Sequence, residues 1–119
     1  MKSHIDREFV REVEKVFTET YPYLRIEFHR DGPRWLRSVQ SGIEVEDWER
    51  LARELLRDEI RLTDEMTVGE LEGRLKEVLG VPAVIVRRSG NFWIETSMTQ
   101  NWTLREQNEH GKELGGRIG

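Results

Sequence analysis

The sequence contains no cysteine, little proline and no long apolar run. None of its 119 residues is Cys, and only three are Pro. Without Cys the chain can form no disulfide, no thiolate metal site and no cysteine nucleophile. No apolar stretch approaches the roughly 18 residues of a membrane span, and residues 1–10 carry too many charges for a signal peptide. These absences lead us to expect a cytoplasmic protein without a membrane segment.

The charge balance is slightly acidic. Asp and Glu number 23 against 19 Lys and Arg, which gives a formal net charge of −4. This balance argues against general nucleic-acid binding, although it leaves room for a local basic patch. The length suits one domain, and we expect residues 1–119 to form a single domain with a sizeable core.

Two parts of the chain resemble each other at an offset of 58 residues. Residues 10–36 align without a gap to residues 68–94, and seven of the aligned positions are identical. Chance would give about two identities. The matched positions include Trp35 with Trp93, and the apolar positions of the two segments also correspond. Any two helix–strand–hairpin units share some of this pattern, but we interpret it as an internal duplication.

The duplication predicts two structural copies followed by a frayed tail. The first copy covers about 4–57, the second about 60–114, and the Gly-rich tail covers 115–119. Within each copy, the apolar pattern predicts a helix, a strand, a tight turn and a second strand. The duplicated units would therefore contribute two hairpins to one sheet.

Local signals place the helices. Apolar residues at helical spacing predict helices over 5–17, 46–57, 68–79 and 104–114. Thr67 and Glu70 form a capping box before the third of these, and Gly80 provides its stop signal. Thr103 and Glu106 form a second capping box before the fourth.

The predicted hairpins turn at Arg-x-Gly sequences over 30–32 and 88–90. A three-residue loop with a left-handed Gly gives a type I turn followed by a bulge. In the second hairpin, this register places four apolar side chains on the core face: Val84, Val86, Phe92 and Ile94. Residues 59–63 are predicted to add a short strand. The predicted fold is α+β, with an antiparallel four-stranded sheet made of two hairpins, helices on one face and pseudo-twofold symmetry.

The sheet face opposite this core is the first candidate binding surface. It would carry Trp35 and Trp93 with arginines beside them, a pattern typical of protein interfaces and of stacking platforms for single-stranded nucleic acid. Alternatively, the helix around Trp48 or the C-terminal segment covers this face, and both Trp belong to the core. The candidate binding residues are Trp35, Trp93, Arg37, Arg87, Ile85 and Trp102.

No catalytic or metal-binding pattern is recognised. The three histidines lie far apart, and none has the spacing of a zinc ligand. Glu27 and His29 would share a strand face and could form an acid–base pair, although a solvated cross-strand contact is the commoner arrangement. No catalytic residue, metal or cofactor is therefore predicted. Enzymatic activity stays open, but the sequence favours a non-enzymatic function.

Three functional hypotheses follow. The leading one is a small protein-interaction module that binds a protein partner or self-associates. The second is a small-ligand binder or enzyme with a pocket near Trp93, Thr96, Asn101 and Trp102, although these polar residues could simply end a strand and cap a helix. The third is single-stranded nucleic-acid binding, which the acidic balance disfavours.

The C-terminal half resembles a family of short bacterial proteins to which no activity is attached. These proteins carry a Ser-Gly-Asn-x-Trp-x-Glu-Thr hairpin followed by Trp-Thr-Leu-x-x-Gln-Asn. The matching positions are Ser89, Gly90, Asn91, Trp93, Glu95, Thr96, Trp102, Thr103, Leu104, Gln107 and Asn108. The resemblance implies a bacterial origin and no mechanism.

A narrower resemblance is to ubiquitin-like β-grasp domains, through the helix at 67–79 and the later Thr103 and Leu104. Those domains have a hairpin immediately before the helix, where this chain offers only residues 59–63. We therefore prefer the duplication.

Overall fold

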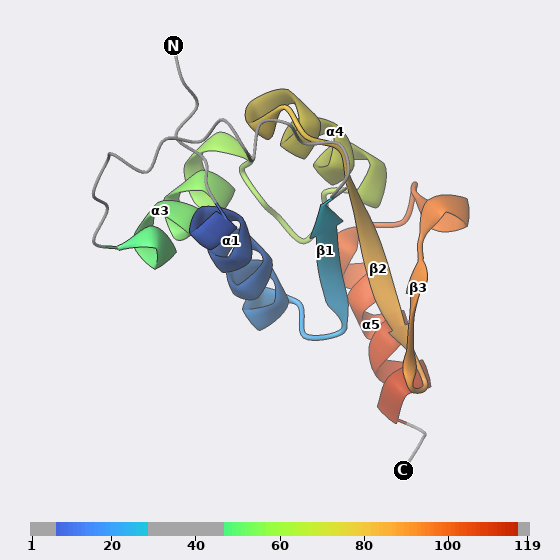
Figure 1. Ribbon diagram of the computed structural model, residues 1–119. Coiled ribbons are helices and arrows are strands. Elements are labelled where there is room, and N and C mark those ends of the chain that lie inside the picture. The colour runs from blue at the N-terminus through green and yellow to red at the C-terminus, as the bar shows by residue number, and fades with distance from the viewer. Residues whose placement is uncertain (1–6, 29–46, 117–119) are drawn as a thin grey trace.

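The computed structural model describes residues 7–28 and 47–116 (Figure 1). The described elements follow one another as α1 (Arg7–Thr20), β1 (Leu24–Phe28), α3 (Trp48–Glu54), the π-helical turn η1 (Leu55–Glu59), α4 (Val68–Leu79), β2 (Ala83–Ser89), β3 (Phe92–Glu95), the 3₁₀ turn η2 (Ser97–Thr99) and α5 (Leu104–Gly116). The chain is therefore α+β, as the sequence predicts.

The sheet has three antiparallel strands in the order β1-β2-β3, so the prediction of a four-stranded sheet is wrong. β1 pairs directly with β2, from Leu24 opposite Arg87 to Phe28 opposite Ala83. The segment predicted as the second strand of the first hairpin lies outside the described residues. The periodicity of each segment predicted strands, but strand partners are chosen by tertiary packing, which a single sequence does not specify.

The hairpin of β2 and β3 forms where predicted, but its register is different. Ser89 pairs with Phe92, which leaves a two-residue loop of Gly90 and Asn91 instead of a bulged three-residue loop. Gly90 has a φ of 62°, as required at the first central position of a type II′ turn. The predicted grouping of side chains is therefore wrong, because Val84 and Val86 face away from Phe92 and Ile94.

The helix signals are confirmed. The capping box of Thr67 and Glu70 is present at α4, and Gly80 ends that helix with a left-handed φ of 75°. At α5, the amide N–H of Thr103 donates to Glu106 Oε1, and the amide N–H of Glu106 donates to Thr103 Oγ1. An isolated β-bridge joins Thr67 to Thr103, so the two capped N-termini lie side by side.

The helix predicted over 46–57 is present as α3 and η1, but the strand predicted over 59–63 is absent. The chain instead continues as a π-helical turn to Glu59, and the amide N–H of Ile60 donates to the Leu55 carbonyl at 2.9 Å. Arg61 then adopts a φ of 61°, which ends regular structure. Ile60 is fully buried, so its apolar character reflects the core.

The helices pack against one face of the sheet. That face carries Leu24 and Ile26 of β1 and Ala83 and Ile85 of β2, which belong to one apolar cluster with residues of α1, α3, η1, α4 and α5. Figure 1 shows α1 and α3 together on one side of the sheet, with β3 at the far side. The other face of the sheet, here called the outer face, carries Arg25, Glu27, Val84, Val86, Arg88, Trp93 and Glu95.

Buried polar groups join α5 to the sheet. Gln107 has no exposed surface, and its Nε2 donates to the carbonyl and the hydroxyl of Thr99 at 2.9 and 2.7 Å. Its Oε1 accepts from Arg87 Nη1 at 2.9 Å. The amide N–H of Tyr23 donates to Asn108 Oδ1 at 2.9 Å. Two residues of the family-like motif, Gln107 and Asn108, therefore have structural roles here.

α5 crosses the sheet very closely at Gly111. A Cβ atom at this position would lie 2.9 Å from the Tyr23 Cβ and 3.0 Å from the Arg87 Cγ. Real Cβ atoms do not approach other atoms so closely, so any larger residue must push the helix away from the sheet. Gly73, inside α4, has nothing within 4 Å of the same position and provides a natural comparison.

We expect Gly111→Ala to lower the free energy of unfolding by about 1–2 kcal/mol, because strain outweighs the gain in helix propensity. Gly73→Ala should raise it by about 0.5–1 kcal/mol, because only the propensity changes. Urea unfolding followed by circular dichroism measures both. Equal stabilisation by the two substitutions would contradict the close crossing.

A buried hydroxyl links α1 to the loop before α4. The Tyr21 hydroxyl donates to Asp64 Oδ1 at 2.6 Å, and Tyr21 is 5% exposed. Burial, and next the hydrogen bond to Asp64, raise the pKa of Tyr21 above its ordinary value. A raised pKa in the folded state means that the protonated phenol stabilises the fold. This contribution is complete below the unfolded pKa of about 10 and is lost as the pH rises through the folded pKa.

Tyr21→Phe should therefore lower the free energy of unfolding by about 1–2 kcal/mol at neutral pH, since the Asp64 carboxylate loses its donor. The difference from the wild type should shrink above about pH 10, where unfolding begins to release the Tyr21 proton. Tyr23→Phe is the control, because its hydroxyl has no hydrogen bond among the described residues. A gap that stays constant through alkaline pH would refute this role for Tyr21.

Candidate functional site

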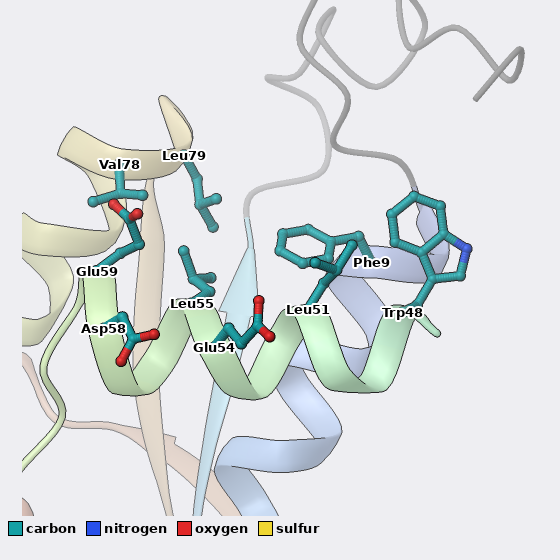
Figure 2. Close-up of a pocket in the computed structure, with 9 residues that line it drawn as sticks. All are labelled: Phe9, Trp48, Leu51, Glu54, Leu55, Asp58, Glu59, Val78 and Leu79. Atoms are coloured by element: carbon teal, nitrogen blue, oxygen red, sulfur yellow. The ribbon is translucent and has the colours of Figure 1, made fainter. Parts of the chain in front are cut away.

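An apolar groove of about 390 Å³ lies between α3 with η1 on one side and α1 and α4 on the other (Figure 2). Six apolar residues line it: Phe9, Trp48, Leu51, Leu55, Val78 and Leu79. Three carboxylates complete the lining: Glu54, Asp58 and Glu59. All three carboxylates come from α3 and η1, so the charge lies along one rim.

The apolar side of the groove comes from the periodicity of α3. Trp48, Leu51 and Leu55 recur at helical spacing, as the sequence predicts. Leu55 is buried, but Trp48 and Leu51 are only half-buried because they line the groove at the margin of the core. The Phe9 and Trp48 rings lie 5.9 Å apart with a tilt of 56°, so two aromatic rings form one end of the groove.

The π-helical turn sets the acidic rim. A π turn contains an extra residue compared with an α turn, so it shifts the side chains that follow it around the helix axis. Figure 2 shows Glu59 extending toward Val78 of α4, while Asp58 lies lower on the same turn. Such turns are rare and are often found at functional sites. The turn therefore shapes the groove and also marks it for attention.

The three carboxylates differ in their partners. Glu54 accepts from Arg50 at 3.1 Å, and Asp58 accepts from Arg57 at 2.8 Å. The hydrogen bond from Arg57 lowers the pKa of Asp58, so this carboxylate stays ionised well below neutral pH. Glu59 has no ion-pair partner among the described residues. Because these pairs are exposed, the arginines screen the rim only weakly.

The outer face of the sheet carries Trp93, but its ring is not freely presented. The Arg25 guanidinium lies 4.6 Å from the ring centroid, and that of Arg88 lies 5.7 Å away. Arg25 also donates to Glu27 at 2.7 Å, and Arg88 Nε donates to the Gly90 carbonyl at 2.7 Å. The indole is thus half-buried under groups of its own sheet. Trp35 and Arg37 lie outside the described residues.

Two other candidate residues lie on the covered face. Ile85 is fully buried in the apolar core. Arg87 is 9% exposed, and its guanidinium donates to Gln107, while burial lowers its pKa. The bulged register had placed both residues on the outer face. The two-residue turn shifts β2 relative to that expectation, so both side chains point toward the helices.

The residues of the predicted ligand pocket have separate partners. The Thr96 hydroxyl donates to the Ile85 carbonyl at 2.8 Å. Asn101 is exposed. Trp102 packs edge-on against His110 at 5.3 Å in a shallow groove of about 300 Å³, with Glu106, Glu109 and Glu113. Trp93 does not line this groove, so the ligand-binding hypothesis stays a prediction.

The described residues were also considered for metals and membranes. In residues 7–28 and 47–116, no group of three or more His, Asp or Glu side chains is placed to hold a metal ion. Among the helices described, none combines the length and apolar character needed to cross a bilayer.

The sequence missed the groove although it contained its main signal. The apolar stripe of α3 was recognised, but a stripe does not reveal whether its far end meets the core or solvent. The available hint was the run of acidic residues at 58 and 59 directly after the stripe. The other wall, Val78 of α4, is 37% exposed and comes from a helix assigned wholly to the core.

Comparison with known proteins adds no further information. No protein-family model, curated protein or solved structure matches the chain. The candidate site therefore depends on its own geometry and chemistry.

Proposed function

We propose that this protein is a small protein-interaction module whose groove between α3, η1 and α4 binds a basic amphipathic helix of a partner protein. The observation that carries the proposal is the division of the groove into apolar walls and a single acidic rim. An amphipathic helix presents the matching pattern, with apolar anchors on one face and cations beside them. The protein is expected to act in the bacterial cytoplasm.

The apolar residues would provide most of the binding energy. Val78 and the half-buried Trp48 and Leu51 still expose apolar surface at the groove. Covering such surface contributes about 25 cal/mol per Å² removed from water. Trp is also among the residues most often found at binding hot spots.

The acidic rim would decide which partner is accepted. Glu54, Asp58 and Glu59 attract a Lys- or Arg-rich helix and repel an acidic one. The formal net charge of −4 acts in the same direction over a longer range. The groove therefore supports binding of a basic helix better than binding of an apolar or acidic segment.

A synthetic peptide tests this function. We expect saturable binding of a fluorescein-labelled 18-residue peptide (about five helical turns) with Leu at i, i+3, i+4 and i+7 and Lys elsewhere, measured by anisotropy. A peptide with Glu in place of Lys should not bind, because the rim repels it. Glu59→Lys should weaken binding about fivefold, since an attraction of up to about 1 kcal/mol is lost. Val78→Ser should weaken it by a similar factor through lost apolar contact.

Two matched controls separate the groove from the rest of the surface. Glu109→Lys makes the same charge change on α5, and Met98→Ser removes an apolar side chain that is 92% exposed elsewhere. Both should leave the dissociation constant unchanged. Equal binding of the acidic peptide, equal effects of Glu59→Lys and Glu109→Lys, or no saturable binding would each refute the proposal.

A further inference from the structure

One edge of the sheet ends in a short strand that lacks the usual protection. β3 is the last strand in the order β1-β2-β3, and Figure 1 shows it at the margin of the molecule, away from α1 and α3. Natural edge strands are commonly blocked by Pro, Lys, a bulge or a covering loop. Phe92–Glu95 contains neither Pro nor Lys and pairs with β2 without a bulge.

This edge also concentrates exposed apolar side chains. Phe92 is 72% exposed and Ile94 is 38% exposed, and both lie on the face of the sheet that α5 covers farther inward. Met98, in the turn that follows β3, is 92% exposed. These are three of the four large apolar side chains that are exposed in the described part of the chain, and the fourth, Val78, lies at the groove.

The hydrogen-bond pattern of the hairpin shows which backbone groups of β3 point outward. Phe92 lies opposite Ser89 and closes the two-residue turn, and the amide N–H of Thr96 donates to the Ile85 carbonyl. Phe92, Ile94 and Thr96 therefore direct their backbone groups toward β2. Trp93 and Glu95 alternate with them and direct their N–H and C=O groups away from the sheet.

We propose that β3 pairs antiparallel with β3 of a second copy of this chain, about a twofold axis at Ile94, so that two three-stranded sheets become one six-stranded sheet. An antiparallel pair brings side chains of the same face together, so the axis must pass through a residue and not between two residues. An axis at Ile94 pairs Trp93 with Glu95 of the second copy. All four outward groups of each strand then form hydrogen bonds.

The side chains support this register on both faces. On the helix-covered face, Ile94 meets Ile94 of the second copy, and β-branched pairs of this kind stabilise sheets. On the outer face, Glu95 of the second copy would lie beside Trp93, whose ring already carries the guanidinium groups of Arg25 and Arg88. The exposed Glu95 carboxylate thus meets positive charge, and the strand is complementary to itself.

Proline substitution at Glu95 tests the pairing. The outward Glu95 N–H is not needed for pairing with β2, so Glu95→Pro should preserve the hairpin but remove a donor from the proposed interface. Sedimentation velocity across a concentration series should show the wild type rising from 14.1 kDa toward twice that mass. Glu95→Pro should raise the dimer dissociation constant at least tenfold. Glu95→Gln, which keeps the N–H, should still dimerise.

A second variant and a direct readout protect the test against misfolding. Ile94→Lys keeps every backbone donor but places two like charges opposite each other at the axis, so it should also give a monomer. In concentrated wild-type protein, the Trp93 and Glu95 amides should exchange with solvent more slowly than in dilute protein. A wild type that stays monomeric, a dimer that survives both Glu95→Pro and Ile94→Lys, or fast exchange of these two amides in a dimer would overturn the proposal.

This inference is independent of helix binding at the groove. Val78→Ser, which should weaken peptide binding, should leave the dimer unchanged. Ile94→Lys should in turn leave peptide binding unchanged, so the failure of either proposal can be recognised without the other.

Discussion

The close crossing of α5 over the sheet at Gly111 constrains much of the structure. It brings the helix backbone against Tyr23 and Arg87, which only a residue without a side chain permits. At this distance Gln107 is sealed beneath the helix, where its amide must satisfy both Arg87 and Thr99. A hydrogen-bonded amide in this position fixes the orientation of α5 more sharply than apolar packing alone.

The position of α5 also explains why β3 differs from the other strands. The helix packs along β2, with fewer contacts to β1, and does not extend over the far strand. Ile85 is consequently buried, while Ile94 and Phe92, on the same face, remain exposed. The two faces of β3 are therefore unusual for an edge, with apolar side chains on one and an arginine-covered indole on the other. This arrangement gives the strand its capacity for self-recognition.

The groove and the β3 edge lie in different parts of the molecule and use different physics. The groove is made by helices, and its selectivity comes from carboxylates on a π-helical turn. The edge offers backbone hydrogen bonds whose register is fixed by the turn at Gly90. A dimer joined at β3 would carry two grooves, so a partner with two basic helices would gain affinity through the higher effective concentration of the second site.

The sequence by itself determined the local elements. Capping boxes at Thr67 and Thr103, the stop at Gly80 and the apolar periodicity of each helix depend on residues within a few positions of one another. The turn between β2 and β3 was located correctly, but its type was not, because Gly90 suits either a bulge or a type II′ turn. That single ambiguity reversed the faces of Ile85 and Arg87.

Only the tertiary structure decided strand partners, the number of strands in the described sheet and the position of the groove. Each depends on contacts between residues distant in the sequence, such as β1 with β2 and η1 with α4. An apolar side chain has the same local pattern whether it meets the core or the margin of a groove. Long-range packing alone distinguishes Leu55, which is buried, from Trp48 and Leu51, which are half-exposed.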